Sequence, residues 1–548
     1  MSETPKQNYR TIVLLLLTLV YGFNFIDRQI VGILAPFIQA DLGLTNTQLG
    51  LLIGLAFAAF YTILGIPLAF LADRMNRVTL LSIALATWSG FTALTGFAQN
   101  FMHIALARVG VGIGEAGGSP PSHSMISDFY SKDERAGALG VYSLGIPLGI
   151  MSAYFLTAFL LGTDPNTVNW RRIFIILGIT GVALSLIVRL VIREPKRGAM
   201  ESGTKLPSGY ISIPNSWRQA NIRNRFIVLG ALIIGYLIGI VFGITTVTFI
   251  GLIGFLVAAV SLIALSLKPD NNSMNFIPHF LTYSALLLGY IVGHFFGVMP
   301  FYLYIPIALV LLMMFLLSLQ PGVMTILSIK SWWWMALGIA FASFASYAIS
   351  GFQTKFLKLL DPDFNFRTII IWIGIINGTF YVAGTYFGAK LVDWRAKTDI
   401  RAYGTIPAIS ILLAFPLAVG AFWAPNVVLH LVIGAALQLC LGVYLGPSFA
   451  IAQTLAPIKL RAMSTALFFF VLNMIALGGG PTFAGAMIDV FLYKSTAELN
   501  ATRMAMYVTF GAYVLAFLFF MLVRKTLPKD WQEAEDRNKA VTDSESSA

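Results

Sequence analysis

The chain has 548 residues, of which 57% are hydrophobic and only 11% are charged. A soluble domain carries about 25% charged residues, so this composition excludes a soluble protein and predicts an all-α polytopic membrane protein. The net charge of +12 does not indicate a nucleic-acid partner, because the basic residues form short clusters between apolar segments, which is the positive-inside pattern of membrane proteins. The single cysteine, Cys440, excludes a disulfide within the chain and a Cys-based metal site.

Six apolar segments precede residue 195, and each is close to the roughly 20 residues that span a bilayer as a helix. They cover 11–36, 49–71, 78–98, 102–125, 136–161 and 172–192. The polar start followed by an apolar run resembles a signal peptide. However, no small-x-small cleavage site follows the run, which continues through Asp27 to Phe37, so we interpret it as an uncleaved first membrane helix.

The middle of the chain is unusual. A basic linker is predicted at 196–225, and the stretches 226–267 and 271–329 contain no Asp, Glu, Lys or Arg. Each stretch is long enough for two membrane spans, with breaks near Gly243 and Pro300. We therefore expect about four inserted helices within 226–330 and sixteen in all, or fourteen if one stretch is re-entrant. Their role stays open between bracing the bundle, shaping a lipid entrance and mediating assembly.

Six further apolar segments follow residue 330. They cover 332–355, 368–390, 402–422, 426–452, 462–490 and 502–523. The basic clusters of both halves fall on one side, which predicts a cell-membrane protein with both termini in the cytoplasm. The expected domains are two six-helix bundles, 1–195 and 331–525, followed by a polar and disordered cytoplasmic tail at 526–548.

An internal repeat relates the two halves. Pro121-Ser122 lies fourteen residues before Arg135, and Pro447-Ser448 lies fourteen residues before Arg461, at an offset of 326. Repeated six-helix halves with a substrate site near the membrane midplane are a known transporter architecture.

Ionisable residues interrupt two apolar segments of the first half, Asp27-Arg28 in the first and Arg108 with Glu115 in the fourth. Charges inside a membrane usually line a water-accessible path or a binding cavity. Arg108 and Glu115 are seven residues apart, so they share one helix face about 10 Å apart. Gly112 lies between them and leaves space either for a ligand or for close helix packing.

The side chains of Asp27 and Arg28 point about 100° apart on a helix. We expect Asp27 to face Arg108 across the first and fourth helices and Arg28 to lie nearer Glu115 or a neighbouring helix, although a helix rotation would reverse this assignment. Our hypothesis assigns proton coupling to Asp27 and Glu115 and substrate binding to Arg28, Arg108 and Gly112. An anion that engages Arg108 would free a carboxylate to bind a proton. The alternative is a static charge pair that holds the helices together.

The segment LADRMNR, with Asp73, Arg74 and Arg77, resembles the cytoplasmic signature loop of the major facilitator superfamily. Ala69 and Asn76 stand where that signature has glycine. In the superfamily this loop acts as a latch between helices, and the alternative is a solvated charged turn. The resemblance implies a cytoplasmic latch, formed here by Asp73, Arg74, Arg77, Arg135, Asp393 and Arg461.

The segments FNFIDRQ and RVGVGIGEAGGSPPS resemble the spinster branch of this superfamily, over the whole of the first six helices. Spinster relatives are implicated in proton-linked movement of lysophospholipids and sphingosine phosphate. The anion:cation symporter branch, which carries sugar acids, shares much the same charged residues. The resemblance therefore implies a major facilitator fold and a proton-coupled carrier.

The predicted spans of the second half contain almost no ionisable residues, only hydroxyls and amides such as Gln353, Gln438 and Gln453. We assign two further amides, Asn377 and Asn473, to substrate binding. One charged wall and one apolar wall suit an amphiphile, which favours a lysolipid over a sugar acid.

We conclude from the sequence that the chain is a secondary active transporter. No ATP-binding motif is present, and no nucleophile, metal set or catalytic dyad indicates an intramembrane enzyme. A receptor or scaffold without transport is disfavoured by the charged residues. We expect no cofactor except the coupling proton, no metal, a small-molecule or lysolipid substrate, membrane lipids as partners, and a monomer. The sequence leaves symport and antiport open.

Overall fold

The computed structural model describes residues 7–72, 75–161, 169–197, 326–457, 461–494 and 497–546. The chain divides into two compact units, Met1–Ser202 with Ile329–Ala548, and Gly203–Ser328. Nearly all described residues belong to the first unit. The predicted linker and the four predicted inserted helices lie outside the described residues, apart from a few residues at their ends.

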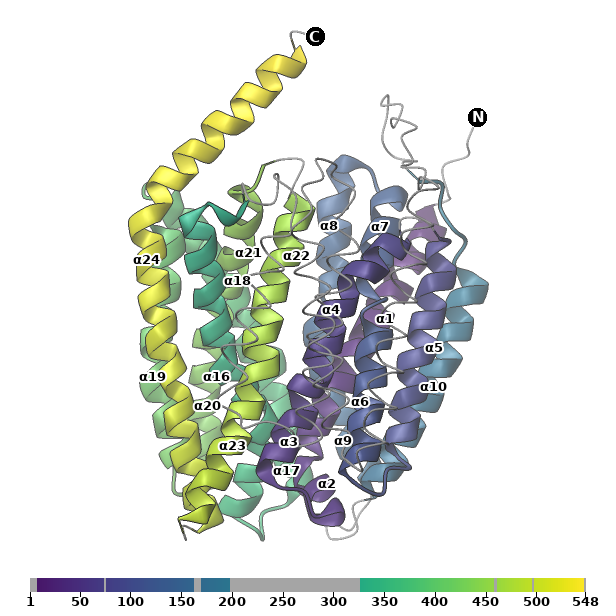
Figure 1. Cartoon of the computed structure of the whole chain (residues 1–548), viewed down its shortest axis with the longest axis vertical. Coiled ribbons are helices and arrows are strands. Elements are labelled where there is room, and N and C mark those ends of the chain that lie inside the picture. The colour runs from purple at the N-terminus through teal and green to yellow at the C-terminus, as the bar shows by residue number, and fades with distance from the viewer. Residues whose placement is uncertain are drawn as a thin grey trace, which may run out of the picture. The chain divides into compact units, whose positions relative to one another are not determined.

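The described residues of the first half form ten helices, and each predicted span is occupied by one helix or by two in succession (Figure 1). They are α1 (Gln7–Ile33), α2 (Ala35–Leu42), α3 (Asn46–Ile53), α4 (Leu55–Ala72), α5 (Arg77–Thr95), α6 (Phe101–Glu115), α7 (Ser119–Phe129), α8 (Lys132–Ser143), α9 (Gly145–Leu160) and α10 (Trp170–Val191).

The second half repeats this plan from residue 330 onward. Its elements are α16 (Lys330–Leu360), α17 (Phe366–Ile376), η2 (Asn377–Tyr381), α18 (Val382–Ala396), α19 (Ala402–Trp423), α20 (Val427–Val443), α21 (Leu445–Thr454), α22 (Arg461–Leu472), η4 (Asn473–Gly479), α23 (Gly480–Tyr493) and α24 (Glu498–Ser546), where η marks a π-helical segment. The predicted repeat segments fall on α7 and α21, at the same stage of each half.

The polar residues between the apolar segments set several helix starts. Five helices begin after an asparagine whose side-chain oxygen accepts a hydrogen bond from a backbone N–H of the first turn, which is the usual N-cap arrangement. These caps are Asn76 for α5, Asn100 for α6, Asn169 for α10, Asn365 for α17 and Asn426 for α20.

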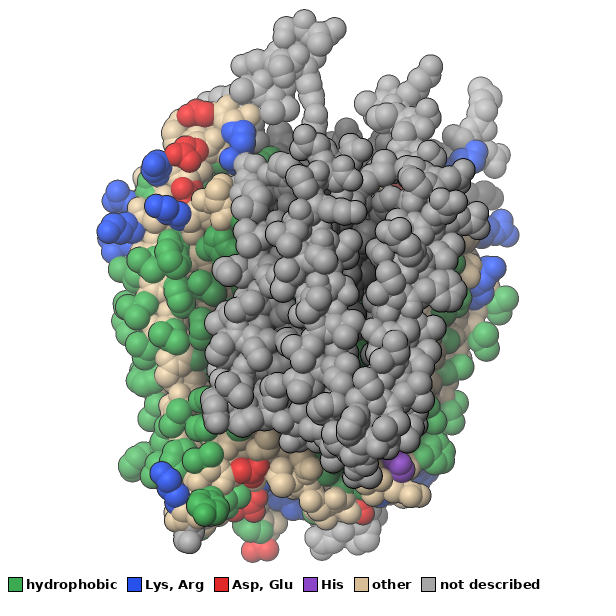
Figure 2. Space-filling model, in the orientation of Figure 1, with side chains coloured by type: hydrophobic (Ala, Val, Ile, Leu, Met, Phe, Trp, Pro, Cys, Tyr) green, Lys and Arg blue, Asp and Glu red, His purple; other side chains and the backbone are tan. Residues whose placement is uncertain are grey.

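Ten helical segments of the described residues are long and apolar enough to cross a membrane. Figure 2 shows the corresponding surface along α24 and α19, at the left of the view, where hydrophobic side chains form a band. Basic side chains gather beyond the end of this band, where Arg524, Lys525 and Lys529 are exposed. A hydrophobic band with basic residues at its border is typical of a membrane-spanning helix bundle. The predicted all-α polytopic membrane fold is therefore confirmed.

Among the described residues, the most extensive contacts between the two halves are those of α3 with α23, α9 with α17 and α4 with η4, and α16 also contacts α1 and α2. The first of these contacts is very close. A Cβ atom at Gly50 of α3 would overlap the backbone oxygen of Pro481, so only glycine permits this approach. The contact places α3 against the opposite half at the end of the bundle away from the chain termini (Figure 1).

A polar network of buried and partly buried residues joins the halves at the same end, and we call it the cross-half network. Asp489 of α23 accepts hydrogen bonds from the backbone nitrogens of Asn46 (3.1 Å) and Thr47 (2.7 Å) and from both of their side chains (2.8 and 2.6 Å). Lys355 of α16 donates to Gln39 at 2.7 Å and to Asn46. Thr354 donates to the Gly32 oxygen at 2.7 Å, and Ser350 donates to Gln29 at 2.9 Å.

The prediction of a disordered tail is wrong for residues 526–546, which continue α24. Long-range contacts hold this extension. Asp530 accepts a hydrogen bond from the Ser331 backbone nitrogen at 2.7 Å, Trp531 stacks on Tyr403, and Arg537 donates to the Leu455 oxygen at 2.6 Å. These contacts add to the helix preference of the sequence itself, which is rich in Gln, Glu, Ala, Arg and Lys.

Candidate functional site

An ion pair buried inside the first half joins α1 to α6. The Arg28 Nε donates to Glu115 Oε2 at 2.8 Å, and the Glu115 side chain is fully buried. A buried ion pair gains from its low-dielectric surroundings only when its geometry and further hydrogen bonds offset the loss of hydration. The expectation that Arg28 lies nearer Glu115 is confirmed.

Arg108 and Asp27 are both buried beside this pair, but their charged groups do not meet as expected. Arg108 donates through Nε to the Leu52 oxygen at 3.3 Å and through Nη1 to the backbone oxygen of Asp27 at 3.5 Å. Among the described residues, no ion pair within 4.0 Å links the Asp27 carboxylate to Arg108. α3 ends one residue after Leu52, and the carbonyls of a last helical turn lack intrahelical partners, so they are available to Arg108.

Aromatic rings surround the guanidinium of Arg28, and one of them also lies beside that of Arg108. The Arg28 Cζ lies 4.3 Å from the ring centroid of Tyr61, 5.0 Å from that of Phe57 and 5.0 Å from that of Phe25. The Arg108 Cζ also lies 5.0 Å from the centroid of Phe57. A cation over an aromatic face is attracted by the ring quadrupole, and the attraction grows when water is excluded. Sequence reasoning missed these rings.

Several polar atoms of this cluster have no hydrogen-bond partner among the described residues. They are Asn24 Oδ1, Asp27 Oδ1, Arg108 Nη2 and Glu115 Oε1. Buried polar atoms are nearly always hydrogen-bonded, and exceptions call for an explanation. Here one cationic donor and three acceptors lie within one cluster, which is the complement of a ligand that carries an acidic oxygen together with hydroxyl or proton donors.

Gly112 serves close packing, one of the two predicted alternatives. A Cβ atom at this position would lie 2.7 Å from the Phe57 oxygen and 3.3 Å from the Tyr61 nitrogen. α6 therefore rests on the backbone of α4 between Arg108 and Glu115. The geometry does not support direct substrate contact at Gly112.

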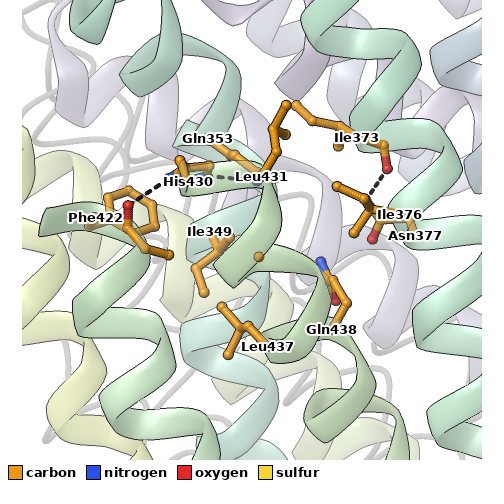
Figure 3. Close-up of a pocket in the computed structure, with 12 residues that line it drawn as sticks. Ile349, Gln353, Ile373, Ile376, Asn377, Phe422, His430, Leu431, Leu437 and Gln438 are labelled. Atoms are coloured by element: carbon orange, nitrogen blue, oxygen red, sulfur yellow. Dashed lines mark hydrogen bonds between the residues drawn. The ribbon is translucent and has the colours of Figure 1, made fainter. Parts of the chain in front are cut away.

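Asn377 does not join this cluster. It lines a small cavity within the second half, together with Gln353, His430 and Gln438 and apolar side chains of α16, α17, α19 and α20 (Figure 3). The volume of this cavity is about 10 Å³, which is room for a single water molecule. Asn473 is buried at the start of η4, the segment that contacts α4. Substrate binding by either asparagine stays a prediction.

The imidazole of His430 closes one wall of this cavity. Its Nδ1 lies 2.8 Å from the Ala421 oxygen, and its Nε2 lies 3.0 Å from Gln353 Nε2. A carbonyl oxygen only accepts, so Nδ1 carries the hydrogen and Nε2 accepts from Gln353.

The predicted latch residues divide into three groups. Asp73 and Arg74 lie outside the described residues. Arg77 is buried within the first half, where it donates to Glu194 (2.7 Å), Asp128 (2.5 Å), Ser124 (2.8 Å) and the Pro195 oxygen (2.9 Å). Arg77 thereby ties α5 to α7 and to the chain that follows α10.

The remaining latch residues have contacts within their own halves. Arg135 donates to the Ser127 oxygen at 2.8 Å, Asp393 accepts from the Tyr403 hydroxyl at 3.2 Å, and the backbone oxygen of Arg461 accepts from Thr465 at 3.0 Å. A latch between the two halves stays a prediction.

The expectation that the second half holds almost no ionisable residues is wrong at Lys355, His430 and Asp489. Lys355 is 4% exposed and pairs with Glu498 at 2.7 Å. The rule that identified Asp27 also applies to Lys355, because it is an ionisable residue at the end of an apolar segment.

Comparisons with known proteins identify the family of the chain. The family model described as Major Facilitator Superfamily matches residues 17–360. An MFS-type efflux pump of Mycolicibacterium smegmatis is 35% identical over 32% of this chain and 40% of its own length. The probable L-galactonate transporter of Escherichia coli is 31% identical over 34% and 40%, and human protein spinster homolog 1 is 29% identical over 40% and 42%. The chain thus spans only about two fifths of the length of these relatives.

A solved structure covers far more of the molecule. It is a bacterial homologue of the human lysosomal transporter Spinster in an inward-facing, occupied conformation, with a TM-score of 0.67 and 23% sequence identity over 96% of this chain and 99% of that one. At this identity the likeness concerns the fold. The chain is a multi-pass membrane protein of the Major Facilitator Superfamily, and it is similar to spinster proteins over part of their length.

Proposed function

We propose that this protein is a proton-coupled secondary active transporter of an organic anion that works by alternating access. The observation that carries the proposal is the buried Arg28–Glu115 ion pair, with Arg108 and Asp27 beside it. Relatives of the chain bear the names of transporters of both lipids and sugar acids.

The charges of the cluster supply a coupling mechanism. Two arginines and two carboxylates form a neutral set when all four are ionised. An anion that binds to Arg108 leaves this set with net negative charge, and an uncompensated buried charge is costly. A proton taken up by Asp27 or Glu115 restores neutrality. Anion and proton therefore enter the buried site more favourably together than either does alone.

For the substrate, we propose an amphiphilic anionic lipid, such as a lysophospholipid or a sphingosine phosphate-like molecule. The head group of such a lipid carries an acidic oxygen and hydroxyl donors, which fit the unpartnered donor of Arg108 and the unpartnered acceptors of Asn24, Asp27 and Glu115. In this proposal the apolar side chains of the second half contact the hydrocarbon chain of the lipid.

The second candidate is a sugar acid carried with a proton. One observation favours it, because polar side chains that are scattered along the sequence of the second half gather in the structure. Gln353, Asn377, Gln438 and His430 gather around one cavity there and offer groups that bind hydroxyls. The sugar acid meets the same arginines through its carboxylate.

We further propose that both termini lie in the cytoplasm and that the cross-half network closes the extracellular side. The basic clusters of the sequence support this orientation. The arrangement then faces inward, and the predicted latch lies at the cytoplasmic end of the bundle.

Uptake into proteoliposomes under an imposed pH gradient tests the proposal. We would compare radiolabelled lysophosphatidylglycerol with radiolabelled galactonate, using the wild type, Glu115→Gln and a matched control, Glu134→Gln. Glu134 also pairs with an arginine, Arg10 at 2.9 Å, but this pair is exposed. We expect Glu115→Gln to lose gradient-driven uptake while it retains exchange of labelled for unlabelled substrate, and Glu134→Gln to keep both.

Undiminished gradient-driven uptake by Glu115→Gln contradicts its coupling role. Uptake of galactonate alone replaces the lipid proposal with the sugar-acid candidate. Failure of a folded wild-type protein to move either compound contradicts both substrate classes.

A further inference from the structure

The geometry points to Phe57 as a positioning residue that holds the guanidinium of Arg108 in reach of the substrate anion and away from the carboxylates. This inference rests on the proposed function and concerns the same site. Phe57 carries no charge and no polar atom in its side chain, so no motif of ionisable residues identifies it.

One ring contacts two cations. The centroid of Phe57 lies 5.0 Å from the Cζ of both Arg28 and Arg108, and the side chain is fully buried. Tyr61, one helical turn later on α4, stacks on Phe57 with centroids 5.4 Å apart and planes inclined by 15°. The stack fixes the ring, and the ring fixes both guanidinium groups through its quadrupole.

The backbone places this ring with little freedom. Because Gly112 lacks a Cβ atom, α6 approaches the carbonyl of Phe57 closely, between Arg108 and Glu115 on the same helix face. The backbone of Phe57 thus meets α6 at Gly112, which lies between the two charged residues of that helix. A longer separation of α4 and α6 would withdraw the ring from Arg108.

The hydrogen bonds of Arg108 show what the ring prevents. Arg108 donates to two backbone oxygens, those of Leu52 and Asp27, and its Nη2 has no partner among the described residues. One oxygen of each buried carboxylate, Asp27 Oδ1 and Glu115 Oε1, also has none in the part of the chain that the structure describes. A guanidinium with conformational freedom would join such oxygens in an ion pair, because paired buried charges are far more stable than unpaired ones.

The consequence is a site that is ready for an anion. With the ring present, Arg108 Nη2 is available to an acidic oxygen of the substrate. Without the ring, Arg108 turns toward Asp27 or Glu115, and the substrate must displace a carboxylate before it binds. Loss of the ring therefore weakens substrate binding more than it slows the later steps of transport.

The test uses two variants of the same residue. Phe57→Leu removes the ring and retains an apolar side chain, whereas Phe57→Tyr keeps an aromatic ring at this position. The control is Phe174→Leu, the same change at another buried ring of the first half, one that packs on Trp170. Uptake of galactonate and of lysophosphatidylglycerol gives KM and kcat for each protein. Cation–π interactions of this kind correspond to about a tenfold change in binding.

We expect Phe57→Leu to raise KM about tenfold with a much smaller change in kcat, Phe57→Tyr to recover most of this loss, and Phe174→Leu to leave KM unchanged. Equal KM values for Phe57→Leu and wild type overturn the inference. An increase in KM of the same size in Phe174→Leu overturns it too, because the effect is then general loosening of the bundle.

A second measurement separates this inference from the proposed function. If the wild type transports neither probe, the proposed function fails, and an experimental structure of Phe57→Leu decides the positioning role by itself. Movement of the Arg108 guanidinium from the two backbone oxygens onto a carboxylate supports the role. An unmoved Arg108 overturns it.

Discussion

The carboxylate of Asp489 should control how readily the end of the bundle away from the termini opens. It accepts four hydrogen bonds from Asn46 and Thr47 of the opposite half. In Asp489→Asn one oxygen remains to accept from Asn46, while the new amide group cannot accept from Thr47. Two hydrogen bonds to a charged acceptor are lost, each contributing roughly 1.5–3 kcal/mol.

Water replaces these partners once the halves separate, so we discount the sum to about 2 kcal/mol of preference for the closed arrangement. This corresponds to about a 30-fold change in the population of the open arrangement. The only cysteine makes the measurement direct. In a Cys440→Ser background, Ile53→Cys places a thiol at a buried position that packs on Gly351 of the other half. The rate of maleimide labelling in detergent then reports opening.

We expect Asp489→Asn to label at least tenfold faster than its parent. Asp41→Asn is the matched control, because Asp41 lies in the same part of the fold but pairs with Trp170 and Arg171 of its own half. Identical labelling rates for Asp489→Asn and its parent would refute the reasoning, since the network would then contribute nothing to closure.

Three further changes test the packing and the caps. Gly50→Ala should destabilise the α3–α23 contact by about 1–3 kcal/mol through overpacking, whereas Gly90→Ala, which has open space around it, should be neutral in the same thermal melt. Arg77→Lys should lower the stability of the first half by about 3–5 kcal/mol. The reason is that a lysine cannot reach Asp128, Glu194 and the Pro195 oxygen together. An unchanged melting temperature contradicts this prediction. Asp530→Ala should lower the free energy of unfolding by about 1 kcal/mol, because it removes the acceptor for the Ser331 backbone N–H at the start of α16. Hydrogen exchange at the Ser331 amide should then increase. Protection equal to that of the wild type would show that this cap is dispensable.

The helices were predictable because length and polarity dictate them. The apolar segments were long enough to span a bilayer, and the polar residues between them include the asparagine caps. Helix spacing also placed Arg28 beside Glu115. The tail was mispredicted because its polarity was taken as a sign of disorder, although it is rich in good helix formers and although Asp530, Trp531 and Arg537 contact residues distant in sequence.

The details of the site were less predictable. Arg108 turned to backbone oxygens instead of the Asp27 carboxylate, and the break between α3 and α4 that supplies the Leu52 oxygen has no strong sequence signal. A sequence signal did exist for the aromatic pair, because Phe57 and Tyr61 are four residues apart and therefore share a helix face. The burial of Lys355 was not predicted, because this residue lies at the end of a predicted span, where a lysine side chain normally reaches water.

The cap that Asp489 provides for α3 has a consequence for the synthesis of the chain. The first turn of α3 leaves the ribosome 443 residues before the carboxylate that receives its backbone N–H groups. Through most of translation, the opening turn of α3 therefore depends on Thr45 and on water. Its last partner arrives only when the eleventh of the twelve predicted core spans has been made. A chain that stops short of residue 489 lacks the carboxylate that accepts from Asn46 and Thr47, so the contact of α3 with the opposite half is incomplete until the eleventh span has been made.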